Sequence, residues 1–355
     1  MSRAEDTPQP LLINLLREAG AAIRLFDMGR RVDKLNIETF RKIEQAQIPY
    51  PHPFLHQAWI GVLIWNPKQR QQNAIWFLKL PLDEQGYLVQ AARDDLVARL
   101  LQNALNQRQG VTDEDALKDN PFAFTPDQEK MAIFHAQAAL AMGNQASVHY
   151  ESAEAYLSGQ LPVERWTDLG LQGLADFVVR LEQGNHARAR ALAERIGEMP
   201  LPALASLATL LEHCTPPQVV AEALAQRLAQ LLQATTEEES LILAALVRGL
   251  SNCADEAFKQ QQVLRVLHSE HALEAEVIVA IATRATSTLQ APQVLLPFLE
   301  RLAAGKAGQA GFSRVLADLM FMPAQRALIL QAFRNPERSD QLSRAIGAMF
   351  GQHFD

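Results

Sequence analysis

A short internal repeat in the second half of the sequence limits the folds that this chain can adopt. Residues 206–214 (SLATLLEHC) return 39 positions later as residues 245–253 (ALVRGLSNC), with leucines and a cysteine at the same places. The matched positions are Leu207 with Leu246, Leu211 with Leu250, and Cys214 with Cys253. A looser third copy begins at Pro292, which lies 75 positions after Pro217. A period of roughly 40 residues with two helices per copy is typical of HEAT-type repeats.

Such repeats bury a continuous core between neighbouring copies and leave a long surface available for binding. From residue 128 onward the sequence predicts one helix after another, with Pro or Gly at most of the breaks. We therefore expect residues 128–355 to form an all-α, HEAT-like helical-repeat domain, that is, an α-solenoid.

Residues 1–110 carry a different pattern, which predicts an α+β domain with a small antiparallel sheet. An amphipathic helix is expected after Pro10 and is expected to end at Gly20. Asn36 is the expected N-cap of the helix that follows it. Trp59, Trp65 and Trp76 are expected in the sheet core. The predicted strands are 22–26, 31–35, 58–65 and 73–80, and the later helices are 37–46 and 87–107.

Residues 111–127 predict a linker between the two domains. The segment combines an acidic run at 113–115 with prolines at 121 and 126, a composition that is typical of domain boundaries. Phe122 and Phe124 are expected to fasten part of it to a domain surface.

The sequence shows no sign of a membrane-spanning, exported or disulfide-rich protein. No apolar run approaches the ~18 residues of a membrane span, and the first residues carry no export signal. Two cysteines in 355 residues do not make a disulfide framework. We therefore expect a cytoplasmic protein that does not contact a membrane, and we expect no cofactor.

The net charge of −7 argues against nucleic acid as a partner. The densest basic stretch, from Arg24 to Lys42, is interrupted by Asp27, Asp33 and Glu38. We interpret it as a solvated surface, with a phosphate-binding patch as the alternative.

Two adjacent carboxylates, Asp83 and Glu84, follow the second long strand directly. Neighbouring carboxylates can bind a divalent cation or act as an acid and a base, because burial beside another carboxylate raises one pKa. They can equally begin the helix at 87, where Asp83 would cap free N–H groups and negative charge suits the helix dipole. We favour capping and keep both residues as a candidate site.

A second candidate site consists of acidic residues at the starts of helices in the repeat region. Its members are Glu237, Glu238, Glu239, Asp255 and Glu256. Clustered acids can attract a basic partner protein, although acids at helix starts also complement the helix dipole.

The N-terminal domain, with its tryptophan-bearing strands and the Leu82-Asp83-Glu84 motif, resembles an uncharacterised bacterial family. That family is known from gammaproteobacteria and is described only as a domain of unknown function. The resemblance covers essentially the full chain and implies a bacterial cytoplasmic protein. It assigns no functional residue.

These observations predict a non-enzymatic scaffold or adaptor that binds another protein through a helical-repeat surface. The alternative is an enzyme with an atypical carboxylate or metal site at Asp83 and Glu84 in the α+β domain. The sequence contains no phosphate-binding loop and no recognisable hydrolase or zinc-protease motif, which excludes the easily recognised enzyme classes only.

Overall fold

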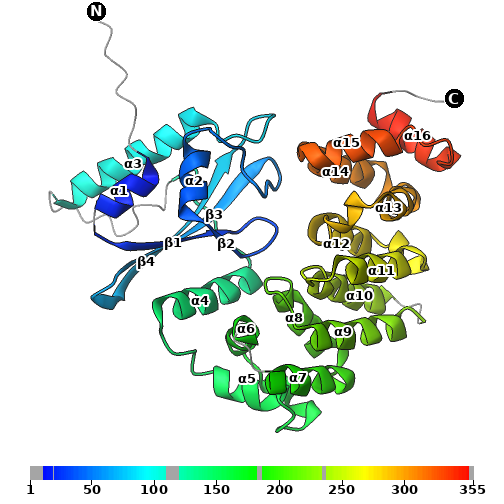
Figure 1. The fold of residues 1–355 in the computed structure, drawn as a ribbon, viewed down its shortest axis with the longest axis horizontal. Helices are drawn as coiled ribbons and strands as arrows, with labels where there is room; N and C mark the ends of the chain where they lie inside the picture. The colour runs from blue at the N-terminus through cyan, green and yellow to red at the C-terminus, as the bar shows by residue number, and fades with distance from the viewer. Residues whose placement is uncertain (1–10, 19, 109–119, 182–185, 234–236, 352–355) are drawn as a thin grey trace, which may run out of the picture. The chain divides into compact units, whose positions relative to one another are not determined.

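The computed structural model describes residues 11–18, 20–108, 120–181, 186–233 and 237–351. The chain divides into two compact units, residues 1–127 and residues 128–355. Figure 1 colours the first unit blue and cyan and the second unit green to red.

Within its described residues, unit 1 is an α+β domain built on an antiparallel sheet with the strand order β2-β1-β3-β4. The helices α1, α2 and α3 lie on one side of this sheet (Figure 1). The elements are α1 Leu12–Glu18, β1 Ala22–Asp27, β2 Asp33–Leu35, α2 Ile37–Glu44, β3 Gln57–Asn66, β4 Gln69–Pro81 and α3 Gln90–Arg108.

The register of the sheet explains which side chains form its core. Leu25 lies opposite Val62, which lies opposite Trp76, so these side chains share one face of the antiparallel sheet. Leu25 and Val62 are buried on the face that the helices cover. The predicted strands are confirmed, and so are two helix ends. Gly20 has the left-handed φ of 71°, and the Asn36 side chain accepts hydrogen bonds from two N–H groups of α2.

Two expectations for unit 1 need correction. Part of the predicted linker belongs to the sheet edge, because Lys79 donates its N–H to the Phe122 carbonyl at 2.7 Å and Phe124 donates to the Phe77 carbonyl at 3.1 Å. The three tryptophans are half-buried and not fully in the core. One of them, Trp59, packs edge-on against Phe124 with 4.8 Å between ring centroids. Residues 111–119 of the predicted linker lie outside the described residues.

Unit 2 is helical throughout its described residues. Its α-helices are α4 Gln128–Met142, α5 Tyr150–Leu157, α6 Leu171–Val179, α7 His186–Glu198, α8 Leu201–Leu211, α9 Gln218–Leu231, α10 Glu237–Leu250, α11 Glu256–Leu267, α12 Ala275–Arg284, α13 Pro292–Ala304, α14 Gly308–Phe321, α15 Pro323–Ala332 and α16 Asp340–Met349. Short 3₁₀ turns lie between some of them, at Val163–Asp168, Glu270–Leu273 and Thr288–Gln290.

The helices of unit 2 pack in rows. α4, α6, α8, α10, α12 and α14 contact one another in that order, and α5, α7 and α9 form a second row beside them. α11 and α13 pair in the same way, and α13 contacts α15 and α16 (Figure 1). Each even-numbered helix of the first row is therefore followed along the chain by a helix that lies outside that row.

The internal repeat of the sequence coincides with this packing. Leu207 and Leu246 lie in α8 and α10, and Leu211 and Leu250 are the last residues of those two helices. All four leucines are buried, as are Cys214 and Cys253, which form no disulfide. The matched positions are thus the ones that fill the core between α8 and α10.

A close approach of α8 and α10 occurs at Gly249. A Cβ atom at this position would lie 3.0 Å from the Ala208 carbonyl oxygen and 3.2 Å from its Cα. We expect Gly249→Ala to lower the free energy of unfolding by about 1–2 kcal/mol, because the backbone of α8 would have to move. Gly197, in α7, is the matched control, since a Cβ there meets nothing within 4 Å. Gly197→Ala should add about 0.5–1 kcal/mol, measured by urea unfolding.

Arginines in the second layer of helices bind the carbonyl ends of preceding helices. Arg227 in α9 donates to the carbonyls of Ile196, Gly197 and Met199 at the end of α7, at 2.8–3.0 Å. Arg195 in α7 donates to the Tyr156 carbonyl in α5, and Arg301 in α13 donates to the Leu267 carbonyl that ends α11. These cations satisfy acceptors that a helix leaves free and oppose the negative end of its dipole.

Candidate functional site

The candidate binding site is the exposed surface of three neighbouring helices, which we call the α8–α10–α12 face. It consists of the exposed residues Ser206, Leu241 and Val279 and the half-buried residues Thr209 and Thr283. Leu241 is the fifth residue of α10 and Val279 is the fifth residue of α12, and these helices contact each other. Leu241 is 53% exposed and Val279 is 38% exposed. Two large apolar side chains are thus presented at equivalent positions of adjacent helices.

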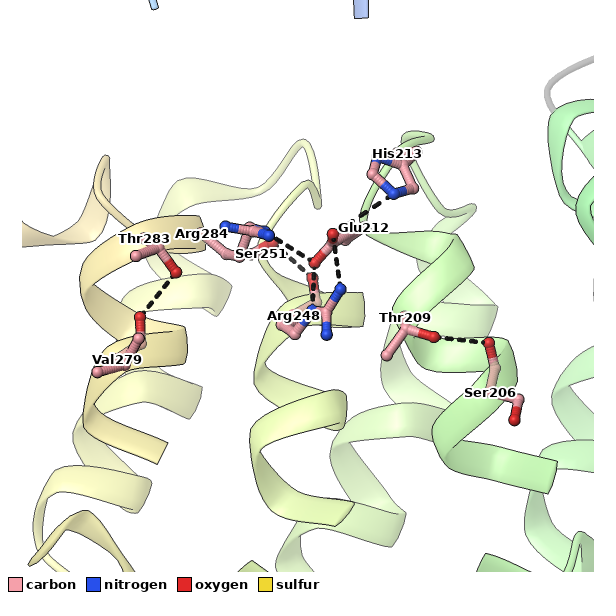
Figure 2. A network of polar contacts seen from close by, with 9 residues as sticks. All are labelled: Ser206, Thr209, Glu212, His213, Arg248, Ser251, Val279, Thr283 and Arg284. Carbon is pink, nitrogen blue, oxygen red and sulfur yellow. Dashed lines mark hydrogen bonds and ion pairs between the residues drawn. The ribbon is translucent and has the colours of Figure 1, made fainter. Parts of the chain in front are cut away.

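The hydroxyl groups on this face donate to their own helices. Ser206 donates to the Pro202 carbonyl at 3.1 Å, Thr209 to the Ser206 carbonyl at 2.9 Å, and Thr283 to the Val279 carbonyl at 2.7 Å. Figure 2 shows the last two of these bonds on either side of α10. Because these donors are already used, the face combines large apolar groups with small side chains of low polarity.

A buried ionic network borders this face at the C-terminal ends of the same helices (Figure 2). Glu212 directly follows α8, and its side chain has no exposed surface. Arg248 of α10 binds the Glu212 carboxylate in a bidentate manner, with Nε to Oε2 at 2.6 Å and Nη2 to Oε1 at 3.0 Å. Arg284, the last residue of α12, donates Nε to the same Oε2 at 3.1 Å. One carboxylate therefore connects α8, α10 and α12, which are neighbours in the first row of helices.

The arginines keep Glu212 ionised. Burial alone would raise its pKa, but the hydrogen bond from Arg248 and the charge of Arg284 outweigh burial and lower the pKa from 4.5 to about 2. A group with this pKa carries its charge throughout the physiological range. Glu212 is therefore suited to hold the helices in register rather than to transfer protons.

His213 lies beside Glu212, with 3.4 Å between its Nε2 and the Glu212 Oε1. The pKa of His213 is lowered from 6.5 to about 3, mainly by burial and also by the charges of Arg284, Lys130 and Arg248, although Glu212 opposes this shift. His213 is therefore neutral at pH 7, and this contact becomes an ion pair only in acid.

The structure places Asp83 and Glu84 in a turn that precedes α3. One carboxylate oxygen of Asp83 accepts the N–H groups of Gln85 and Tyr87, both at 2.9 Å, and Glu84 is exposed. The expected capping of the helix by Asp83 is wrong in its detail, because α3 begins later, at Gln90. Asp83 closes its own turn instead, as Asp side chains often do. In the residues that the structure describes, no three His, Cys, Asp or Glu side chains are grouped to hold a metal ion.

The five predicted partner-binding acids do not form one cluster. Glu237, Glu238 and Glu239 lie in the first turn of α10, and the side chain of Glu237 is outside the described residues. Asp255 and Glu256 lie beyond the opposite end of α10, which is about 20 Å long. Asp255 caps α11 by accepting the Phe258 N–H at 3.0 Å, and Glu256 pairs with Lys259 at 2.6 Å.

A comparison with known protein families finds a match over most of the chain. A family model matches residues 11–350, and its description is a protein of unknown function, DUF3549. The chain belongs to the DUF3549 family. The match confirms the resemblance to a family of unknown function, whereas the bacterial origin and the Leu-Asp-Glu motif stay predictions. No curated protein and no solved structure matches the chain.

The ionic network of this DUF3549 chain was missed by sequence reasoning. Glu212, Arg248 and Arg284 look like ordinary surface charges when read singly. The signal that could have found them is their spacing of 36 residues each, close to the repeat period. Among the described residues of this family member, no helix is long and apolar enough to cross a membrane.

Proposed function

We propose that this chain is a non-enzymatic scaffold or adaptor whose unit 2 is a HEAT-like α-solenoid that binds another protein. The repeat period of 39 residues and the row of contacts from α4 to α14 support this architecture. We also place the protein in the cytoplasm, which suits two buried cysteines that form no disulfide.

One observation carries the proposal of protein binding. Leu241 and Val279 are exposed at the fifth position of α10 and of α12, although the residues directly before and after each of them are buried. Exposed apolar side chains that recur at the same position on stacked helices form a continuous contact surface. The Glu212 network fixes the same three helices against one another, so the surface is preformed before a partner binds.

Site-specific cross-linking tests this face in the full chain. A photoreactive benzoyl-phenylalanine at position 279 is expected to give a discrete cross-linked product with a partner protein in host-cell extract. Val219 is the matched control, because it is 39% exposed against 38% for Val279 and lies on α9. The same group at position 219 should give no such product.

Leu241→Asp, made in the chain that carries the cross-linker at 279, should abolish the product by placing a charge in the apolar contact. Equal cross-linking from positions 219 and 279, or no product from either, would contradict the proposed face.

A further inference from the structure

Two large apolar side chains are exposed at the C-terminal end of unit 2. Leu330 of α15 is 40% exposed and Phe350, which follows α16, is 57% exposed. The exposed arginines Arg326, Arg334 and Arg344 belong to the same two helices and the turn between them. We call these five residues the α15–α16 end. The turn also carries the exposed Glu337, and the exposed Asp340 begins α16, so the arginines leave a small excess of positive charge beside the apolar side chains.

Charge is divided unequally along unit 2. Residues 128–283 contain 10 Lys and Arg against 19 Asp and Glu, whereas residues 284–351 contain 8 against 4. The first part, which carries α10 and nearly all of α12, is therefore strongly acidic, and the last part is basic. The two parts of one chain have opposite charge, as two complementary binding surfaces would.

The complementarity is also local. Glu238 precedes Leu241 by three residues on α10, and Glu276 precedes Val279 by three residues on α12. Residues with this spacing are neighbours on a helix surface, and both glutamates are exposed. On the α15–α16 end, Arg326 precedes Leu330 by four residues, which makes them neighbours as well. The exposed apolar residues of the α8–α10–α12 face thus have acidic neighbours, and Leu330 of the α15–α16 end has a basic neighbour.

We propose that the α15–α16 end of one copy binds the α8–α10–α12 face of a second copy. This proposal rests on the proposed function because it uses the same α8–α10–α12 face. The partner is a second copy of this chain. Both surfaces belong to unit 2 of the same chain. The proposed contact therefore joins two separate molecules. Because the two surfaces differ, the contact is head-to-tail, and each dimer keeps one free face and one free end.

A complementation experiment with the full chain tests this contact. One variant carries Leu241→Asp and Val279→Asp, and the other carries Leu330→Asp and Phe350→Asp. All four side chains are exposed, so both variants are expected to fold, which circular dichroism checks. In sedimentation velocity, the unmodified chain should form species larger than the monomer that increase with concentration and decrease with added salt.

Each variant alone should remain monomeric, because each has lost one of the two surfaces. An equimolar mixture should give a dimer and no larger species, since only one intact face and one intact end remain to pair. The control is Val148→Asp, at a side chain that is 91% exposed and lies on neither surface; it should associate like the unmodified chain.

An unmodified chain that stays monomeric at low salt would overturn the self-contact, as would a mixture that stays monomeric while the unmodified chain associates. Cross-linking from position 279 to a different protein would then leave the proposed function standing without this inference. Binding of the α15–α16 end of a monomeric chain to vesicles of anionic lipid would assign that end to a lipid surface and would also overturn the proposal.

Discussion

Arg248→Met is expected to lower the free energy of unfolding by about 3 kcal/mol. The substitution keeps the apolar stem but removes the bidentate partner of Glu212, whose side chain is fully buried. Removing one member of a buried ion pair costs about 3–5 kcal/mol, because the other charge stays buried without compensation. We expect the lower end of that range, since Arg284 still donates to Glu212.

The measurement is urea unfolding of the full chain followed by circular dichroism, with Arg190→Met as the matched control. Arg190 is an exposed arginine of α7, and its loss should change stability by less than about 0.5 kcal/mol. Adding Glu212→Gln to Arg248→Met should recover much of the loss, because the buried negative charge is then gone. Equal effects of the substitutions at 248 and 190 would show that the network does not hold the helices.

Acidification from pH 7 to pH 4 is expected to destabilise the protein by about 3 kcal/mol through His213. The pKa of His213 is about 3 in the folded chain and 6.5 ordinarily, so between these values only the unfolded chain takes up the proton. Its contribution to stability is therefore present above pH 6.5 and is lost as the pH falls toward 3. Glu212 acts in the same direction at lower pH, because its pKa falls from 4.5 to about 2 on folding.

His213→Gln separates the two residues. The variant should lose less stability than the unmodified chain between pH 6.5 and 4.5, and both should lose it below pH 4.5, where Glu212 contributes. His268→Gln, at an exposed histidine that follows α11, is the control and should leave the pH profile unchanged. A profile for His213→Gln that superimposes on that of the unmodified chain would contradict the assignment.

The elements of unit 1 could be predicted from the sequence because local signals there agree with tertiary packing. Asn36 caps α2 and Gly20 lies beyond the end of α1, as their residue types indicate. Phe122 and Phe124 were expected to fasten this segment to a domain surface, but its backbone pairing with β4 was not predicted, because it joins segments more than 40 residues apart. No local pattern carries that information, whereas the composition of the segment is typical of a linker.

The candidate site was less predictable. The acids that stood out in the sequence, such as Asp255 and Glu256, cap a helix start and pair with a neighbouring lysine. Exposure of Leu241 could not be inferred, since an apolar residue in an amphipathic helix is ordinarily assigned to the core. Burial of Glu212 depends on Arg248 and Arg284, which come from other helices, so only the packed structure distinguishes it from a surface glutamate.

In unit 2, the C-terminal ends of some helices depend on arginines from helices that come later in the chain. Arg195, Arg227 and Arg301 each donate to a helix that precedes them in the chain. Removing a helix pair from the C-terminal side removes the arginine donor and exposes the carbonyl groups of the preceding pair. Removing a pair from the N-terminal side removes only the carbonyl acceptors. During synthesis, each of these helix ends is therefore completed only after the following pair has emerged.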